Sequence, residues 1–245
     1  MDALQIALLV GGGIVAGVVN TLAGGGSLLT IPILVLAGLP GTIANGTNRV
    51  GILLQNVVAV WGFRSEGVSE IRQALPVLLP VGIGSVLGAT WAASLSDAIF
   101  ERVFAVAMLL LLVPMLRGGK RGETDAPPWS TATRAIVFFT IGVYGGALQA
   151  GVGIVLLFAL HRSGMDLVRA NALKVVVIAA LTAVAVPVFI LEGQVAWWPA
   201  ALLAAGYSIG AAAGARIAVR GGERVIRPVL VASVIALSGR MFGIY

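Results

Sequence analysis

Apolar residues fill nearly the whole chain, in runs that short polar stretches interrupt. A helix that crosses a bilayer needs about 20 mostly apolar residues, and most of these runs reach that length. The runs predict helices in the first half over 4–22, 27–37, 42–63, 74–95 and 99–116, and in the second half over 133–149, 154–160, 168–191, 196–218 and 225–243. The pattern therefore predicts an all-α polytopic membrane protein.

The two halves repeat one another, and the matches on both sides of one central stretch share a constant offset. The stretch NTLAGGGSLLT at 20–30 is matched by ALQAGVGIVLL at 147–157, where an Ala again precedes two close glycines. Four more matches are each 126 residues apart: Gly38 with Gly164, Ala44-Asn45 with Ala170-Asn171, Glu66-Gly67 with Glu192-Gly193, and Gly84 and Gly88 with Gly210 and Gly214. One offset held at separate places indicates duplication.

A surface linker divides the repeats. The stretch RGGKRGETDAPPWS, from Arg117 to Ser130, has the Gly, Pro and charge content of a loop. We predict a transmembrane repeat over 1–117, a cytoplasmic linker over 118–131 and a second transmembrane repeat over 132–245.

Composition supports the membrane assignment. Hydrophobic residues make up 59% of the chain, charged residues 11%, and the mean hydropathy is +1.03. That leaves too little polar sequence to cover a soluble globule. The net charge of +6 then indicates basic cytoplasmic loops rather than nucleic-acid binding. The apolar N-terminus has no basic leader, so we expect it to be a retained first helix.

Basic residues favour an inverted arrangement of the repeats. If each half crosses five times, the loops at 64–72, 117–134, 162–169 and 216–227 share one side and hold twelve of the sixteen Lys and Arg residues. If the short helices instead return to their own side, the two sides hold seven each. The positive-inside rule favours the first arrangement, with both termini outside.

Glycines break the first helix of each half. The apolar stretch 4–37 would be about 50 Å long as one helix, well beyond the hydrocarbon core. Gly24, Gly25 and Gly26 are the natural place for a break, and Gly151 and Gly153 are its counterpart. Short helices that restart at Ser27 and near Ile154 would present helix N-termini, which favour anions. The alternative is that these glycines only allow close packing, which is the better explanation for Gly84, Gly88, Gly210 and Gly214.

Polar residues lie within the spans that follow the breaks. Arg49 and Lys174 are charged residues inside predicted spans, which by default marks a functional site or a buried partner. A spacing of three places Asn45 with Asn48, and Asn171 with Lys174, on shared helix faces. We expect these faces to converge at the repeat interface. The alternatives are that the Asn residues join helices by hydrogen bonds and that Lys174 extends to the cytoplasmic surface.

The acidic residues all fall in loops or at span ends. No carboxylate is therefore available mid-membrane for a cation site, so the expected substrate is an anion. We find no phosphate-binding loop, no HExxH motif and only one His, His161, so we predict no enzyme, no cofactor and no metal site.

The motifs resemble a known family. AGGGSLLTIP at 23–32, GLP at 38–40 and ANGTN at 44–48 closely resemble the first-repeat signature of the sulfite exporter TauE/SafE family. GGALQAGVG at 145–153 and ANALK at 170–174 resemble its second-repeat signature. The resemblance implies a prokaryotic inner-membrane permease for sulfur-containing anions such as sulfite, sulfoacetate and other organosulfonates, or thiosulfate.

These observations lead to one functional hypothesis. We expect a secondary transporter that exports a small sulfur-containing anion by alternating access at the repeat interface. The alternatives are a passive anion channel and a permease for a non-sulfur carboxylate. Expected partners are the anion and the lipid bilayer, without nucleic acid, and the unit works alone or as a homodimer. The predicted substrate-binding residues are Asn20, Gly24, Gly25, Gly26, Ser27, Asn45, Asn48, Gln149, Gly151, Gly153, Asn171 and Lys174.

Overall fold

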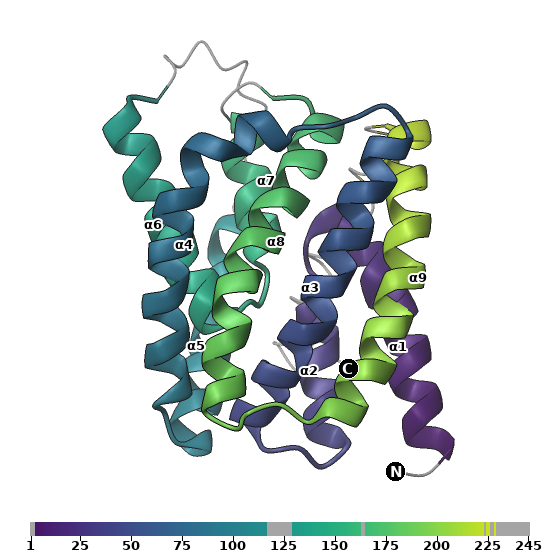
Figure 1. The fold of residues 1–245 in the computed structure, drawn as a ribbon, viewed down its shortest axis with the longest axis vertical. Coiled ribbons are helices and arrows are strands. Elements are labelled where there is room, and N and C mark those ends of the chain that lie inside the picture. Colours follow the sequence, from purple (N-terminus) through teal and green to yellow (C-terminus); the bar gives the residue numbers. More distant parts are fainter. Residues whose placement is uncertain (1–2, 117–128, 163–164, 223, 226–227, 229–245) are drawn as a thin grey trace.

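A computed structural model describes residues 3–116, 129–162, 165–222, 224–225 and 228. The described part is all-helical and holds nine helices (Figure 1). They are α1 (Ala3–Ala23), α2 (Ser27–Leu36), α3 (Gly41–Ser65), α4 (Ile71–Ala93), α5 (Asp97–Leu116), α6 (Thr131–Ala147), α7 (Val152–Arg162), α8 (Leu167–Leu191) and α9 (Trp197–Gly221). Each begins and ends within a few residues of its predicted bounds. The predicted last span, 225–243, lies almost wholly outside the described residues.

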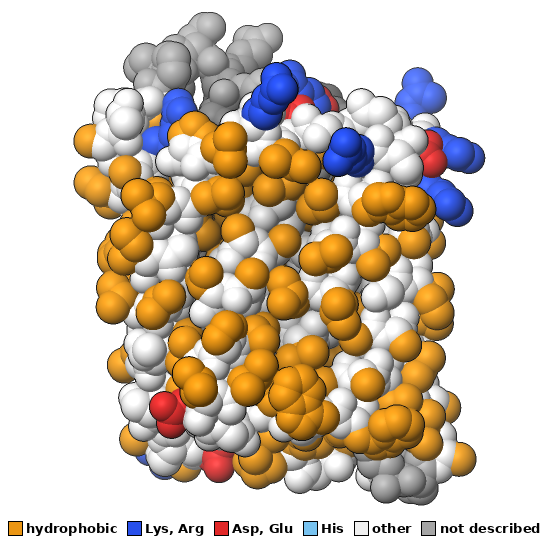
Figure 2. Space-filling model, viewed as in Figure 1, with side chains coloured by type: hydrophobic (Ala, Val, Ile, Leu, Met, Phe, Trp, Pro, Cys, Tyr) orange, Lys and Arg blue, Asp and Glu red, His pale blue; other side chains and the backbone are white. Residues whose placement is uncertain are grey.

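The surface of the bundle is that of a membrane protein. Four helices in the described part are long and apolar enough to cross a bilayer: α1, α4, α8 and α9. On α4, Leu75, Leu79 and Ile83 are exposed, whereas Val77 and Val81 on another side of the helix are buried. Figure 2 shows apolar side chains over the middle of the face and Lys and Arg side chains gathered at its upper end. Large exposed apolar surface of this kind suits lipid rather than water. The chain is an all-α polytopic membrane protein.

The helices pair across the two halves of the sequence. α1 packs along α9, and α4 packs along α6. α3 and α8 contact one another, and they also pack against α9 and α4, respectively. The first helix of each half therefore lies against the fourth helix of the other half.

Glycines allow these pairs to approach closely. A Cβ added at Gly88 on α4 would lie 2.0 Å from the Val143 carbonyl oxygen on α6. A Cβ added at Gly210 on α9 would lie 2.2 Å from the Ile14 carbonyl oxygen on α1. The helix backbones are thus in direct contact, which confirms the close-packing interpretation of these glycines.

The basic loops meet at one end of the bundle. Arg169, at the start of α8, bonds to Glu70, which precedes α4, and Arg220, at the end of α9, bonds to Glu66. At the other end, Gln194 before α9 donates to the Ala93 carbonyl at the end of α4. The contacts bring 66–70, 166–169 and 216–221 together, as the predicted arrangement requires.

The two halves also run in opposite senses. α1 begins at the lower end of the view and α6 at the upper end (Figure 1). These directions support the inverted arrangement. The duplication, the repeat boundaries and the cytoplasmic placement of the linker stay predictions, and 117–128 lies outside the described residues.

Candidate functional site

The first helix of each half is broken close to the predicted glycines, although Gly153 lies in the first turn of α7 and not in the break. α1 ends at Ala23, and the chain turns through Gly24, whose φ is +88°, before α2 begins at Ser27. α6 ends at Ala147, and the chain turns through Gln149 and Gly151 before α7 begins at Val152. A positive φ is readily adopted by glycine but rarely by other residues. Gln149, with φ +60°, is therefore unusual.

The two breaks touch. A Cβ added at Gly24 would lie 2.3 Å from the carbonyl carbon of Gly153, and one added at Gly153 would lie 2.5 Å from the Cα of Gly24. The hydroxyl of Ser27 donates to the Gln149 carbonyl oxygen across the contact, at 3.3 Å. No side chain fits at either glycine, so these residues serve close packing as well as the break.

The end of α1 is capped from the other half. Lys174 on α8 donates from Nζ to the carbonyl oxygens of Asn20 at 2.9 Å and Thr21 at 3.0 Å. Asn171, one turn earlier, donates to the Leu22 carbonyl oxygen at 3.0 Å. The last carbonyls of a helix have no intrahelical partner and carry the negative end of the helix dipole, so a cation here is stabilising.

Lys174 is fully engaged in this cap. Its Nζ also donates to Asn171 Oδ1 at 2.7 Å, which confirms that these two residues share a helix face. Lys174 is 0% exposed, so it does not extend to the surface. An ammonium group has three donors, and all three are used.

The end of α6 is capped in the same way. Asn45 on α3 donates to the Ala147 carbonyl oxygen at 3.0 Å. Arg49, one turn later, donates from Nη1 to the Gly145 carbonyl oxygen at 2.9 Å and to Gln149 Oε1 at 3.1 Å. Each break is therefore held by an Asn and a cation that belong to the opposite half.

Further polar side chains of α3 extend the network. Gln55 accepts a hydrogen bond from Asn20 Nδ2 at 2.9 Å, and Asn20 Oδ1 accepts from the backbone N–H of Gly26 at 3.3 Å. These bonds tie the start of α2 to α1 and α3. Two turns nearer the start of α3 than Gln55, Asn48 Oδ1 accepts from the hydroxyls of Thr30 at 2.7 Å and Tyr207 at 3.0 Å. Asn48 thus faces α2 and α9, and not the α6 break that Asn45 caps.

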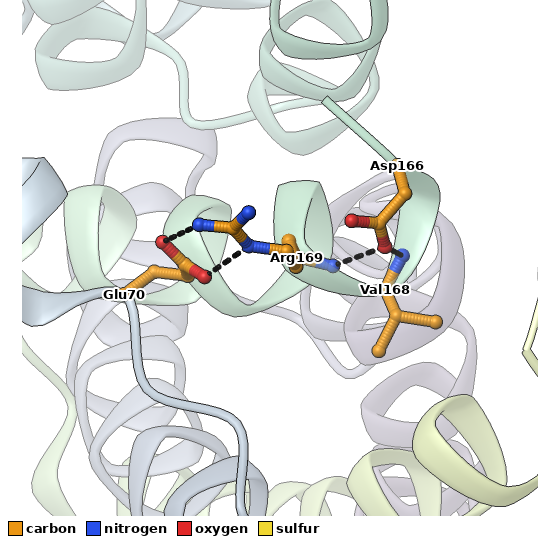
Figure 3. Close-up of polar contacts among 4 residues, drawn as sticks. All are labelled: Glu70, Asp166, Val168 and Arg169. Carbon is orange, nitrogen blue, oxygen red and sulfur yellow. Dashed lines mark hydrogen bonds and ion pairs between the residues drawn. The ribbon is translucent and has the colours of Figure 1, made fainter. Parts of the chain in front are cut away.

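The network is positively charged. Neither Arg49 nor Lys174 pairs with a carboxylate among the described residues, where the ion pairs join Glu66 and Glu70 to arginines at one end of the bundle. Figure 3 shows one of these pairs, between Glu70 and Arg169. Within the same part of the chain, no group of three His, Asp or Glu side chains could hold a metal ion. The site is suited to an anion.

All the predicted site residues lie at the breaks or on the helices that cap them. Direct contacts join Asn20 to Lys174, Lys174 to Asn171, Ser27 to Gln149, and Gly24 to Gly153. Gly25 and Gly151 accept hydrogen bonds from the first turns of α2 and α7. Whether these residues bind a substrate stays a prediction.

The prediction left out several residues of the network. The sequence indicates Arg49 as a charge within a span, but the predicted site does not include Arg49, Thr30, Gln55 or Tyr207. A polar stripe along α3 is the available signal for Gln55, because it lies seven residues, or two turns, after Asn48 and so on nearly the same face of the helix. Tyr207 had no comparable signal.

Comparisons with known proteins agree with this architecture. The model of the sulfite exporter TauE/SafE family matches residues 9–241. "Probable membrane transporter protein ORF9" of a Sinorhizobium species is 29% identical, over 94% of this chain and 89% of its own length. "Probable membrane transporter protein" of Haemophilus influenzae is 28% identical over 98% and 95%, and "Probable membrane transporter protein YfcA" of Escherichia coli K12 is 28% identical over 92% and 85%.

No solved structure matches the chain. The relatives are named as membrane transporters, and the chain is accordingly a multi-pass inner-membrane transporter and not an enzyme. Because the family model covers almost the whole sequence, this chain belongs to the sulfite exporter TauE/SafE family.

Proposed function

We propose that this transporter is a secondary carrier that exports small sulfur-containing anions, such as sulfite, sulfoacetate or another organosulfonate, or thiosulfate. The observation that carries the proposal is the pair of buried cations, Arg49 and Lys174, at the two touching helix breaks, with no carboxylate partner among the described residues. A buried charge of this kind needs a compensating partner, and an anionic substrate supplies one. The family name adds sulfite to the substrates to be tested.

The anion is proposed to bind between the breaks, at Gly24–Ser27 and Gly151–Gly153. Lys174 supplies positive charge, and Asn20, Asn45, Asn48, Gln149 and Asn171 supply hydrogen-bonding groups. Gly24 and Gly153 are in contact in this structure, so the site opens when the two breaks separate. Because each break is capped from the other half, movement of one half against the other changes both breaks together. This coupling supports alternating access.

Counterflow in proteoliposomes tests the proposal. Purified protein is reconstituted, and uptake of each labelled anion is measured against an internal load of the same anion, with sulfite, thiosulfate, sulfoacetate, taurine, sulfate and lactate as the panel. We expect selective counterflow of at least one sulfur oxyanion. Lactate moving as well as every sulfur anion would indicate a carboxylate permease, and no movement of any sulfur anion would reject the proposed substrate class.

Electrical recording separates a carrier from a passive channel. A carrier in a planar bilayer gives no unitary conductance, since each turnover moves few charges. Sustained single-channel currents with the transported anion would reject alternating access. Homodimer formation also stays a prediction, and the mass of the protein–nanodisc complex tests it.

A further inference from the structure

Arg49 has hydrogen-bond donors that the protein does not use. Its side chain is 0% exposed, and Nη1 makes both of its hydrogen bonds, to Gly145 and Gln149. Among the described residues, Nε and Nη2 have no hydrogen-bond partner. Buried polar groups are nearly always paired, so two nitrogens with three unused N–H donors on one buried guanidinium group call for a ligand.

The two unpartnered nitrogens, Nε and Nη2, lie along one edge of the guanidinium group. Nε–H and Nη2–H point the same way, side by side, in a geometry that matches two oxygens of one oxyanion. One face of the group is covered by the Phe189 ring, whose centroid lies 4.6 Å from Arg49 Cζ. The covered face and the bonds at Nη1 fix the plane of the guanidinium group and leave its Nε/Nη2 edge as the free side.

The same edge binds an oxyanion elsewhere in this molecule. Arg169 directs Nε to Glu70 Oε1 at 2.6 Å and Nη2 to Glu70 Oε2 at 3.3 Å (Figure 3). Arg220 contacts the carboxylate of Glu66 through the same two nitrogens, at 3.3 Å each. At Arg49 no described carboxylate takes that place.

Gln149, which bonds Arg49, adds to the evidence for a site at this place. Its φ of +60° is unfavourable for a residue with a side chain, and the strain is retained where the backbone carbonyl meets Ser27 and the side-chain carbonyl meets Arg49 Nη1. Gln149 therefore accepts a hydrogen bond from Nη1 of Arg49, and its backbone links Arg49 to the contact between the two breaks.

We propose that the Nε/Nη2 edge of Arg49 binds one oxyanion group of the transported substrate, a sulfite or a sulfonate, through two parallel hydrogen bonds. Lys174, whose donors are all used, then serves to cap α1 and to supply charge, and does not contact the anion directly. The inference rests on the proposed transport of sulfur oxyanions, and it names the residue that recognises them.

Two variants test Arg49. Arg49→Lys keeps the positive charge but removes the paired donors. Gln149→Glu keeps the shape of the side chain and places a carboxylate against Nη1, so that Arg49 is neutralised in place. Arg169→Lys is the matched control, because it removes the same fork from an arginine at the end of the bundle. Each protein is measured for counterflow KM with the best sulfur anion of the wild type, and for the rise in unfolding temperature that sulfite, sulfoacetate or thiosulfate produces over chloride at equal ionic strength.

We expect KM to rise about tenfold or more in Arg49→Lys and in Gln149→Glu, with loss of the anion-induced stabilisation and no change in the control. If Arg49→Lys does not fold, Gln149→Glu decides alone. If the folded variant, Arg49→Lys or in its place Gln149→Glu, has a KM within about twofold of the wild type, Arg49 does not bind the anion, although anion transport itself remains supported.

The two readouts also separate the two proposals. Wild-type protein that is stabilised by a sulfur oxyanion through Arg49 but does not transport it would reject the function and retain the site. Wild-type protein that no sulfur oxyanion stabilises beyond chloride would overturn the site.

Discussion

The two helix breaks are built alike but leave different chemistry unused. At the α1 break, Asn171 and Lys174 bond three backbone carbonyls, and Lys174 places its third donor on Asn171. At the α6 break, Asn45 and Arg49 bond two carbonyls and the side chain of Gln149, and two further nitrogens of Arg49 have no described partner. Both sites meet the same need, which is to satisfy the exposed end of a broken helix inside the membrane.

The difference follows from the choice of cation. A lysine carries three donors on one atom, and three nearby acceptors use all of them. An arginine carries five donors in a fixed plane, so that capping uses one nitrogen and leaves an edge for another purpose. Both cations therefore have a structural role, and the unused donors of Arg49 are the basis for the binding role that we propose for it.

Removing the lysine cap is expected to have the largest effect. Lys174→Met leaves the Thr21 carbonyl and the Oδ1 of Asn171 without the Lys174 donor in a buried region, and leaves the Asn20 carbonyl only its bond from the Gly24 N–H. We expect the free energy of unfolding to fall by about 3 kcal/mol. Unfolding in mixed micelles, followed by circular dichroism, measures the change.

The control for this variant is Arg102→Met, which removes an exposed basic residue and should change stability by less than about 0.5 kcal/mol. Equal effects of the two substitutions would show that Lys174 does not cap α1. The α1 break would then not be held by a cation as the α6 break is.

A substitution that forces α4 and α6 apart is expected to have the second largest effect on stability. A Cβ at Gly88 would lie 2.0 Å from the Val143 carbonyl oxygen and 2.8 Å from the Ala147 backbone nitrogen, which is in the last turn of α6. We expect Gly88→Ala to lower the free energy of unfolding by about 2 kcal/mol. It should also raise the KM for the anion, because the end of α6 moves with its cap.

Gly82→Ala on the same helix is the matched substitution, since a Cβ there meets nothing within 4 Å. Its stability should not fall below that of the wild type, since Ala favours a helix interior more than Gly does, and its KM should equal that of the wild type. If Gly88→Ala also behaves as the wild type, α4 does not hold the α6 break in place.

The two asparagines are expected to differ from one another. Asn171→Ala removes a bond to the Leu22 carbonyl and an acceptor for Lys174, whereas Asn45→Ala removes only the bond to Ala147, because Asn45 Oδ1 has no described partner. We expect losses of about 2 and about 1 kcal/mol, respectively. Thermal unfolding of both variants side by side measures the difference, and a larger loss for Asn45→Ala would reverse the comparison.

The sequence predicted the helices well because each boundary has a local cause. Gly24 and Gly151 adopt positive φ at the breaks, and Asp166 caps α8 by accepting from the backbone N–H groups of Val168 and Arg169. Helical spacing likewise predicted that Asn171 and Lys174 share a helix face. These features depend on residues a few positions apart.

The capping of each break could not be predicted from local spacing. Arg49 bonds Gly145, and Lys174 bonds Asn20, and these partners lie 96 and 154 residues apart in the chain. The repeat predicted that polar faces meet at the interface. It did not predict which carbonyl each side chain reaches, since Arg49 and Lys174 are not at equivalent positions of the two halves.

The smallest expected effect comes from the arginine whose fork is already occupied. Arg169 is 52% exposed and Glu70 is 5% exposed, so solvent screens their ion pair on one side. Arg169→Lys keeps the charge beside Glu70 and loses the second hydrogen bond, and we expect little loss of stability and no change in anion KM. Counterflow and thermal unfolding measure both quantities in one preparation. The value of this variant lies in its contrast with Arg49→Lys, because the same atoms are removed from each side chain. If KM rises as much in Arg169→Lys as in Arg49→Lys, loss of an arginine's paired donors affects transport through the stability of the bundle. The effect of Arg49→Lys would then not show that Arg49 binds the anion.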